Sequence, residues 1–359
     1  RYNADPEIAR LLLDAGAEKV IIGTQATPEF LSQLPRDRVI AAVDAEDGEV
    51  VVEGWRTKSG ADLLDRIREL QPYVVGFLVT FVEREGGMTG VDFERVKAVL
   101  EAAGGRKVTI AGGVTSAAEI AELDCLGADA QVGMAIYSGA LDLTHAFAAP
   151  LRSDRPDGLW PTIVCDISGE ALGLAYSNGV SLKEAIDTGR GVYFSRSRQA
   201  IWRKGESSGA TQQLLRVDLD CDRDAIRFIV RQNGAGFCHL NSTTCWGEGV
   251  GELARLQRTI AERCESAPAG SYTHRLVNDV NLLASKIREE AAELADADTA
   301  EHVAEEAADV IYFSLVRMIE AGVQLEDVER VLAGRARRVT RRPGNAKAPQ
   351  IENKEEEAK

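Results

Sequence analysis

Strand-like and helix-like patterns alternate along the first 150 residues of this chain. Apolar runs typical of strands occur five times, at 19–24, 39–44, 73–80, 107–113 and 130–134. Amphipathic helices are predicted around them, at 6–16, 59–70, 92–103, 116–126 and 138–148. This alternation indicates βα units that form a parallel sheet. Glycine or polar residues end the strands, where a βα-barrel places its active site, so we expect a partial α/β barrel of the (βα)8 type at 1–150.

Length and composition limit the remaining possibilities. A chain of 359 residues is longer than one hydrophobic core usually organises, so further domains are expected. The formal net charge of -15 opposes nucleic-acid binding, and no apolar run is long enough to span a membrane. Six cysteines in an acidic, enzyme-like chain indicate reduced thiols. We expect a soluble, cytoplasmic enzyme, with any targeting peptide lying outside a sequence that starts at Arg1.

Two changes of pattern divide the rest of the chain. The segment 150–158 contains two prolines and a glycine, which is typical of a boundary between domains. Short runs rich in β-branched residues follow, so residues 157–249 are predicted to form a compact, mostly-β α+β domain. Beyond it the pattern is purely helical, which predicts an all-α domain at 250–345. A charged tail at 346–359 is predicted to be disordered.

The segment 220–224, with the sequence DCDRD, indicates a metal site. On an extended strand, Asp220, Asp222 and Asp224 would point to one side and Cys221 to the other. Carboxylates favour magnesium and thiolates favour zinc, so one short strand could serve two metals. The alternative interpretation is an acidic surface turn beside structural cysteines.

Two more cysteines and a histidine follow this segment, as Cys238, His239 and Cys245. Zinc sites are built from Cys and His side chains that gather in space, which favours zinc over three unrelated buried thiols. Three thiolates donate much charge and make zinc a weaker activator of water, so a nearby general base is expected. His239 is the candidate base, and a purely structural histidine is the alternative.

Residues 195–209 concentrate positive charge in an otherwise acidic chain. Arg196, Arg198, Arg203 and Lys204 lie there among hydroxyl and glycine residues. Guanidinium groups form bidentate hydrogen bonds to phosphate, and glycine lets backbone amides approach it closely. The alternative is a solvated hairpin tip. The candidate substrate-binding residues, of which Lys204 is also a candidate catalytic residue, are Arg196, Arg198, Lys204, Ser207 and Gly209.

In the helical region, Glu290 and Glu293 are three residues apart, as are Glu306 and Asp309. Residues at this spacing share a face of a helix. The second pair lies in an otherwise apolar stretch, where unpaired carboxylates are costly and magnesium would offset the cost. These four residues are therefore predicted to form a catalytic magnesium site, with an exposed acidic helix as the alternative.

The motifs LAYSN, YFSRSRQAIWRKGESSG, DCDRD and CHLNSTTC, in this order, closely resemble phosphoribosyl-AMP cyclohydrolase. The resemblance implies a homodimeric zinc enzyme that opens the purine ring of phosphoribosyl-AMP by hydrolysis. The implied zinc ligands, contributed by both subunits, are Cys221, Cys238 and Cys245. The implied magnesium ligands are Asp220, Asp222 and Asp224.

The two acidic pairs of the helical region, preceded by Lys286 one turn before Glu290, resemble phosphoribosyl-ATP pyrophosphohydrolase and its all-α nucleotide pyrophosphatase relatives. This resemblance implies magnesium-assisted attack of water that releases pyrophosphate. It implies that the acidic residues hold the metal, and Lys286 becomes a candidate substrate contact.

The motifs IIGTQA, VDAEDGEVVVEGW, TIAGGVTS and VGMAIYSG resemble strands four to eight of the phosphoribosylformimino-aminoimidazole-carboxamide ribotide isomerase barrel. Asp44 matches one half of the acid/base pair of that family, and the other half belongs to a strand that this sequence lacks. Because general acid/base catalysis needs two positioned groups, isomerase activity is not expected. Gly112, Gly113 and Gly133 could still cradle a phosphate, and a scaffold or partner surface is the alternative.

These resemblances together predict a hydrolase for the second and third steps of histidine biosynthesis. Its substrates would be phosphoribosyl nucleotides, its cofactors Zn²⁺ and Mg²⁺, and its assembly a homodimer. The order of the parts resembles fungal multifunctional proteins, in which a histidinol dehydrogenase part is expected to follow. The alternatives are a zinc hydrolase or deaminase of another purine nucleotide, and a non-catalytic scaffold with decayed sites.

Overall fold

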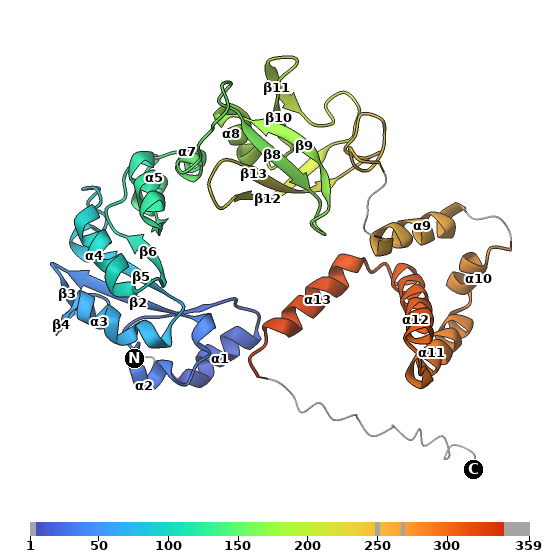
Figure 1. The fold of residues 1–359 in the computed structure, drawn as a ribbon, viewed down its shortest axis with the longest axis horizontal. Helices are drawn as coiled ribbons and strands as arrows, with labels where there is room; N and C mark the ends of the chain where they lie inside the picture. Colours follow the sequence, from blue (N-terminus) through green and yellow to red (C-terminus); the bar gives the residue numbers. More distant parts are fainter. Residues whose placement is uncertain (1–4, 248–251, 267–269, 341–359) are drawn as a thin grey trace, which may run out of the picture.

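The structure, a computed structural model, describes residues 5–247, 252–266 and 270–340. Figure 1 shows three bodies in chain order: an α/β unit, a central β-rich unit and a helical unit. Each body has its own cluster of buried apolar side chains. The fold class predicted from the sequence is confirmed. The predicted charged tail, 346–359, lies outside the described residues.

The first unit, residues 5–149, is built on a mostly parallel sheet. Its parallel strands lie in the order β1 (Val20–Ile22), β2 (Val39–Glu46), β5 (Gly76–Phe81), β6 (Lys107–Ala111) and β7 (Ala128–Gln131). Helical connections return the chain between these strands, as the alternating sequence pattern predicts. Within the described residues β1 pairs only with β2 and β7 only with β6, so the sheet is an open, partial barrel.

The helix predicted at 59–70 is shorter than its pattern indicates. A hairpin of β3 (Glu49–Val52) and β4 (Thr57–Asp62) extends the sheet beyond β2 and takes up the first residues of the predicted helix. Helix α3 (Leu63–Leu70) begins after Asp62, whose carboxylate accepts two backbone amide hydrogen bonds. This aspartate cap determines where the helix starts.

The other helices of the first unit connect or flank its strands. They are α1 (Pro6–Asp14), α2 (Pro28–Leu31), α4 (Phe93–Ala103), α5 (Ala117–Leu126), α6 (Met134–Tyr137) and α7 (Leu143–Ala148). The fifth predicted strand, 130–134, is displaced in the structure, because β7 ends at Gln131 and Met134 already starts α6.

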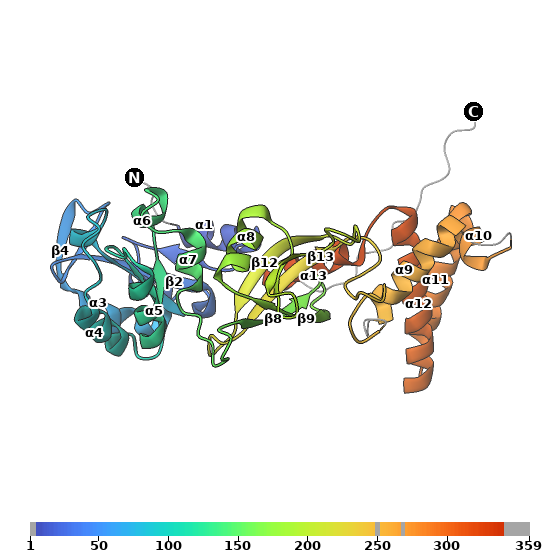
Figure 2. The same ribbon diagram turned by 90° about the horizontal axis from the view of Figure 1, so that it is seen from above.

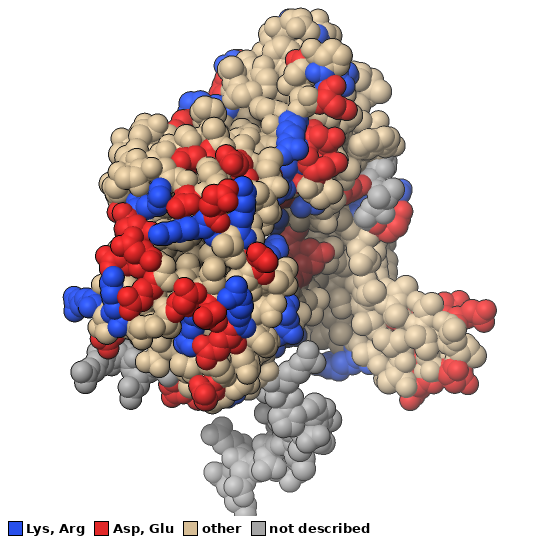
Figure 3. Space-filling view, turned by 60° about the vertical axis from the view of Figure 1, so that its left-hand side comes forward, with Lys and Arg blue, Asp and Glu red and all other residues tan. Residues whose placement is uncertain are grey.

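Charged side chains are interspersed over the surface of the first unit. Figure 3 shows acidic and basic groups side by side on the face that it presents. Several groups of this unit form exposed ion pairs, such as Arg68 with Asp65 at 2.8 Å and Lys97 with Glu94 at 2.7 Å. Exposed pairs contribute less than about 1 kcal/mol each. The unit is therefore held together mainly by its buried apolar side chains.

The central unit, residues 157–247, contains a four-stranded sheet. Its strands lie in the order β12 (Gln212–Leu219), β13 (Ile226–Gln232), β8 (Trp160–Cys165) and β9 (Ala171–Ser177). β13 and β8 are parallel, and the other two pairs are antiparallel. The remaining elements are α8 (Gly179–Thr188) and a hairpin of β10 (Val192–Ser195) and β11 (Ala200–Arg203).

The helical unit follows the central unit. It consists of α9 (Glu252–Ser266), α10 (Tyr272–Asn278), α11 (Val280–Asp296), α12 (Ala300–Glu320) and α13 (Leu325–Arg337). Figures 1 and 2 both show α11 and α12 side by side. Over the part of the chain that the structure covers, no helix combines the length and apolar character that a membrane crossing requires.

Helix α13 extends from the other helices toward the first unit, as Figure 1 shows. Arg38 donates a hydrogen bond of 2.9 Å from Nη1 to the carbonyl of Arg337, at the end of α13. Asp14 accepts hydrogen bonds from the amides of Val339 and Thr340, at 2.8 and 3.0 Å. The helical unit therefore contacts the first unit at the end of α13.

Glu119 ties two loops of the first unit to the start of α5. One carboxylate oxygen accepts hydrogen bonds from the amides of Thr115 and Ser116, at 2.8 and 2.9 Å, and the other accepts one from Val91 at 2.9 Å. Burial raises the pKa of Glu119, but the hydrogen bonds outweigh burial and lower the pKa overall. The ionised form of Glu119 therefore stabilises the folded unit.

Replacing Glu119 with alanine is expected to destabilise the first unit by about 1–3 kcal/mol, because backbone amides lose their acceptor. Since the folded state lowers the pKa of Glu119, its contribution is complete above the ordinary glutamate pKa and is lost as the pH falls through the folded value. Hydrogen exchange of the first unit, followed from neutral to acidic pH, measures the effect. Glu122→Ala, an exposed site on the same helix, is the control, and equal destabilisation by both variants would contradict the prediction.

Candidate metal centres

The acidic segment 220–224 forms the turn between β12 and β13, and the prediction that it is an extended strand was wrong. β12 ends before the segment, and Arg223 adopts a left-handed backbone conformation with φ of 66°. The amides of Asp224 and Ala225 donate hydrogen bonds to Asp220 Oδ1, at 3.0 and 3.2 Å, which closes the chain on itself. Asn, Asp and Gly are the residues that usually occupy left-handed positions, so the sequence does not predict a turn at Arg223.

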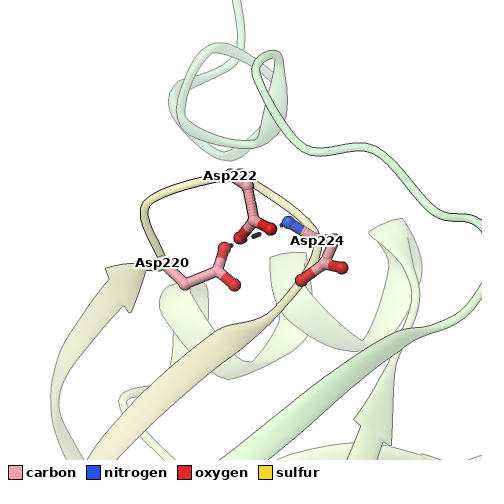
Figure 4. A group of neighbouring side chains, drawn as sticks. All are labelled: Asp220, Asp222 and Asp224. Carbon is pink, nitrogen blue, oxygen red and sulfur yellow. Dashed lines mark hydrogen bonds between the residues drawn. The ribbon is translucent and has the colours of Figure 1, made fainter.

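The turn nevertheless brings its three carboxylates together. Figure 4 shows Asp220, Asp222 and Asp224 around one point, and one oxygen of each lies within 4.8 Å of the others. Burial raises the pKa of Asp220, but hydrogen bonds from the amide of Ala225, from the side chains of Asp224 and Asp222 and from the amide of Asp224 outweigh burial and lower the pKa overall. The pKa of Asp224 is raised by its hydrogen bond with Asp220 and by the charge of Asp222. A cation at this point would relieve the repulsion between these groups.

Two of the three predicted zinc ligands lie together in the loop after β13. Cys238 is buried and Cys245 is exposed, and each thiol is close enough to the other to shift its pKa. The pKa of Cys238 is lowered, first by the backbone amide of Leu240 and then by the Ser242 hydroxyl. Although Cys245 is exposed as a residue, partial desolvation of its thiol raises its pKa, and the neighbouring sulfur of Cys238 raises it further. The thiol of Cys238 therefore ionises more readily than usual, and the resulting thiolate is the form that binds metal.

Cys221 does not join this pair within one chain. Its exposed thiol points to its neighbour Asp222, with Sγ 3.8 Å from Oδ1. Among the described residues, no third Cys, His, Asp or Glu completes a close cluster with Cys238 and Cys245. No disulfide joins any of the six cysteines.

Lys204 and His239 lie beside the paired thiols. Lys204 Nζ donates hydrogen bonds to the carbonyls of Ala210 and Gly236, at 3.2 and 3.4 Å. Burial lowers the pKa of Lys204, and the charges of the two thiols act in the opposite direction, so the ammonium group is close enough to interact with them. His239 is exposed, and its Nδ1 lies 3.9 Å from Sγ of Cys238.

Of the predicted phosphate-binding residues, Arg196 has the most defined surroundings. Its guanidinium carbon lies 3.9 Å from the centre of the Tyr176 ring, at an open cleft of about 460 Å³. The exposed residues Arg198, Ser207 and Gly209 lie on the neighbouring loops, outside the lining of this cleft. The lining residues are Leu174, Ala175, Tyr176, Phe194, Ser195, Arg196, Ser197 and Trp202.

The helical unit gathers three carboxylates from two helices. Glu290 and Glu293 of α11 and Glu306 of α12 each place one oxygen within 4.8 Å of the others. Oε2 of Glu306 is buried and has no hydrogen-bond partner among the described residues. Asp309 is exposed and lies outside this group. An orphaned buried carboxylate oxygen beside two further carboxylates fits a divalent cation.

Nearby cations neutralise only part of this charge. Lys286 Nζ lies 2.7 Å from Glu290 and 3.0 Å from Glu289. His302 Nε2 lies 3.3 Å from Glu306, an ion pair only if His302 is protonated. His302 was not among the predicted site residues, although its spacing of four residues from Glu306 places both on one helix face.

The pKa of Glu293 shows the remaining excess of negative charge. Burial raises this pKa first, and the charges of Glu306 and Glu290 raise it further. Glu293 is exposed, and its pKa is nevertheless raised, so a cation at this point would favour its ionised form.

Three family models match the chain in succession. The model for histidine biosynthesis protein matches residues 4–142, that for phosphoribosyl-AMP cyclohydrolase 173–247, and that for phosphoribosyl-ATP pyrophosphohydrolase 253–336. Both of the latter are families of metal-dependent hydrolases. The paired thiols lie in the second match and the three glutamates in the third.

A histidine biosynthesis bifunctional protein, HisIE, from Thermus thermophilus is 39% identical over 193 residues, which are 50% of this chain and 90% of that protein. The chain belongs to the family of multifunctional histidine biosynthesis proteins. A trifunctional member of this family from Neurospora crassa is 38% identical over 345 residues, which are 94% of this chain and 36% of that protein.

Another trifunctional member of this family, from Kluyveromyces lactis, is 50% identical over 205 residues, which are 57% of this chain and 26% of that protein. The chain therefore spans only about a quarter to a third of the length of these two trifunctional relatives.

Gly173 of β9 lies against the loop that carries the thiols. A Cβ at this position would clash with the ring of Phe237 and lie 3.0 Å from Sγ of Cys245. The missing side chain of Gly173 therefore makes room for the loop that carries the thiols. The sequence analysis did not single out this glycine, because the contact joins residues far apart in the chain.

Gly173→Ala is expected to displace Cys245 and to weaken metal binding at the paired thiols by about tenfold or more, since overpacking of this kind typically costs 1–3 kcal/mol. Metal analysis after dialysis against competing chelator measures the loss. In Gly179→Ala the new Cβ would meet nothing within 4 Å, so this variant of the same unit should retain its metal. Equal retention by both variants would contradict the prediction.

Proposed function

We propose that this chain catalyses the second and third steps of histidine biosynthesis. The helical unit hydrolyses phosphoribosyl-ATP to phosphoribosyl-AMP and pyrophosphate, and the central unit then opens the adenine ring by hydrolysis. The observation that carries the proposal is the placement of the donor groups: paired thiols lie inside the cyclohydrolase match, and three carboxylates with an orphaned oxygen lie inside the pyrophosphohydrolase match.

The assignment of parts follows the sequence boundaries. We assign residues 1–150 to an isomerase-like partial barrel, 157–249 to the cyclohydrolase, 250–345 to the pyrophosphohydrolase and 346–359 to a charged tail. We place the enzyme in the cytoplasm, where thiols stay reduced.

The proposed zinc site combines Cys238 and Cys245 with Cys221 from a second copy of the chain. The exposure of Cys221 and its distance from the other thiols within one chain support a site shared by a homodimer. When bound, zinc would supply an activated water near neutral pH. The lowered pKa of Cys238 supports this assignment, because thiolates are the metal-binding form.

The side chains around the thiols bind the substrate and move its protons. His239 lies close to Cys238 and is exposed enough to exchange protons with solvent, so we assign it the role of general base. Lys204 places a positive charge beside the reacting group. Arg196, at the Tyr176 cleft, binds the phosphate of the nucleotide together with Arg198 and the loop residues Ser207 and Gly209.

Two magnesium sites complete the proposal. Asp220, Asp222 and Asp224 hold one ion, and Glu290, Glu293 and Glu306 hold the other, with Asp309, which lies outside their group in the structure, as the fourth ligand that the sequence predicts. In the helical unit these carboxylates would hold magnesium, which would supply positive charge for the polyphosphate of the substrate. Lys286 keeps Glu290 in place through their ion pair and adds positive charge for the substrate.

Incubation with phosphoribosyl-ATP is expected to release pyrophosphate and then to open the ring, and a chelator should abolish both reactions. Cys238→Ala should reduce ring opening by more than about 100-fold and leave pyrophosphate release unchanged, because only the thiol pair is broken. Cys264→Ala, in α9, is the matched cysteine control. Unchanged ring opening in Cys238→Ala, or deamination of AMP in its place, would contradict the proposal for the central unit.

Glu306→Gln is expected to reduce pyrophosphate release by more than about 100-fold and to raise the magnesium concentration required, because the orphaned oxygen loses its charge. Glu305→Gln, the exposed neighbour on the same helix, should behave as the unmodified protein. Equal activity of the two variants in a steady-state assay would contradict the proposal that the helical unit releases pyrophosphate.

A further inference from the structure

The acidic turn is joined to the first unit by its own arginine. Arg223 Nε and Nη2 both donate hydrogen bonds to the Asp124 carboxylate near the end of α5, at 3.0 and 2.7 Å to Oδ1. The pair is partly shielded, with side chains 30% and 19% exposed. A two-pronged contact of this kind fixes direction as well as distance. Residues 99 positions apart thus connect the isomerase-like unit to the proposed magnesium ligands.

Arg223 is the strained residue of the turn. A non-glycine residue in the left-handed conformation costs of the order of 1–3 kcal/mol unless its surroundings enforce it. The carbonyl of Arg223 accepts a hydrogen bond from the amide of Arg152 at 2.7 Å, and Nη1 donates one to the carbonyl of Asp220 at 2.5 Å. Asp124 and Arg152 both lie outside the central unit. The conformation of the turn is therefore enforced from outside the unit that contains it.

The arrangement of the carboxylates depends on that conformation. The amides of Asp224 and Ala225 reach the Asp220 carboxylate only because the chain reverses at Arg223. Three carboxylates within 4.8 Å repel one another and favour an opened turn whenever no cation is bound. An external anchor on Arg223 opposes this opening.

We propose that the isomerase-like unit braces the acidic turn, and that Asp124 is a positioning residue for the magnesium ligands of the central unit. The proposal rests on the cyclohydrolase function proposed above and gives the first unit a role that needs no isomerase chemistry. Its action is indirect: Asp124 orients Arg223, and Arg223 fixes the turn in which Asp220, Asp222 and Asp224 converge.

A second ion pair between the same two units provides a matched control. Lys183 of α8 lies 2.7 Å from Asp142 at the start of α7, and both are partly exposed. Lys183→Ala removes this contact and leaves every hydrogen bond of the acidic turn in place. If the Asp124–Arg223 pair only joined the two units, its loss and the loss of the Lys183–Asp142 pair should affect the acidic turn equally. If it holds the turn in place, only its own loss should change the turn.

Hydrogen exchange of the metal-free full chain tests the brace without any assay of activity. In Asp124→Ala, the amides of Asp224 and Ala225 should exchange about tenfold faster, because the reversal at Arg223 is no longer enforced. Asp124→Asn, which keeps a hydrogen-bond acceptor, should have a smaller effect. Unchanged exchange at these amides, or the same acceleration in Lys183→Ala, would overturn the proposal.

The magnesium concentration for half-maximal ring opening gives the second measurement. It should rise about tenfold in Asp124→Ala and stay unchanged in Lys183→Ala. Pyrophosphate release by the helical unit of the same molecules, measured at saturating magnesium, reports that this unit is folded, and hydrogen exchange in the core strands of the first and central units reports the same for those units. If the unmodified chain opens no ring, the proposed function fails, and the exchange measurement still decides whether Asp124 braces the turn.

Discussion

Repulsion between like charges held a few ångströms apart is the constraint on which the functional regions of this protein depend. Two charges 4 Å apart near a protein surface repel by roughly 4 kcal/mol. The chain nevertheless holds three carboxylates within 4.8 Å at the acidic turn and three more between α11 and α12, in a protein with a net charge of -15. Only strong local constraints can keep such groups together, and divalent cations are the species that would make the arrangement favourable.

The two clusters meet this constraint in different ways. In the helical unit, two packed helices are rigid, and Lys286 offsets part of the charge through its ion pair with Glu290. At the acidic turn, backbone amides stabilise Asp220, and the conformation of the turn depends on Arg223. The helical cluster is thus contained within its own unit, whereas the turn depends on the first unit through Asp124. The first unit can therefore matter to the chemistry of its neighbour, whatever chemistry of its own it performs.

The sequence predicted much of the fold, because it depends on local patterns. The five parallel strands of the first unit follow from alternating periodicity, and the separate helical unit from its purely helical pattern. The placement of Glu290 and Glu293 on one helix face could also be anticipated, since E-x-x-E spacing limits where side chains point. The turn at 220–224 could not, because the positive φ of Arg223 is imposed by contacts with Asp124 and Arg152 that no local pattern encodes. The role of Gly173 was hidden for the same reason.

The central claim is that these groups converge because they hold metal ions. Anomalous X-ray diffraction from crystals of the protein grown with zinc and manganese tests this claim most directly. The account predicts a zinc peak bonded to the sulfurs of Cys238 and Cys245, with a sulfur of Cys221 from a second copy. It also predicts separate manganese peaks at the acidic turn and between α11 and α12. Metal-free thiols, or a disulfide between Cys238 and Cys245, would contradict it.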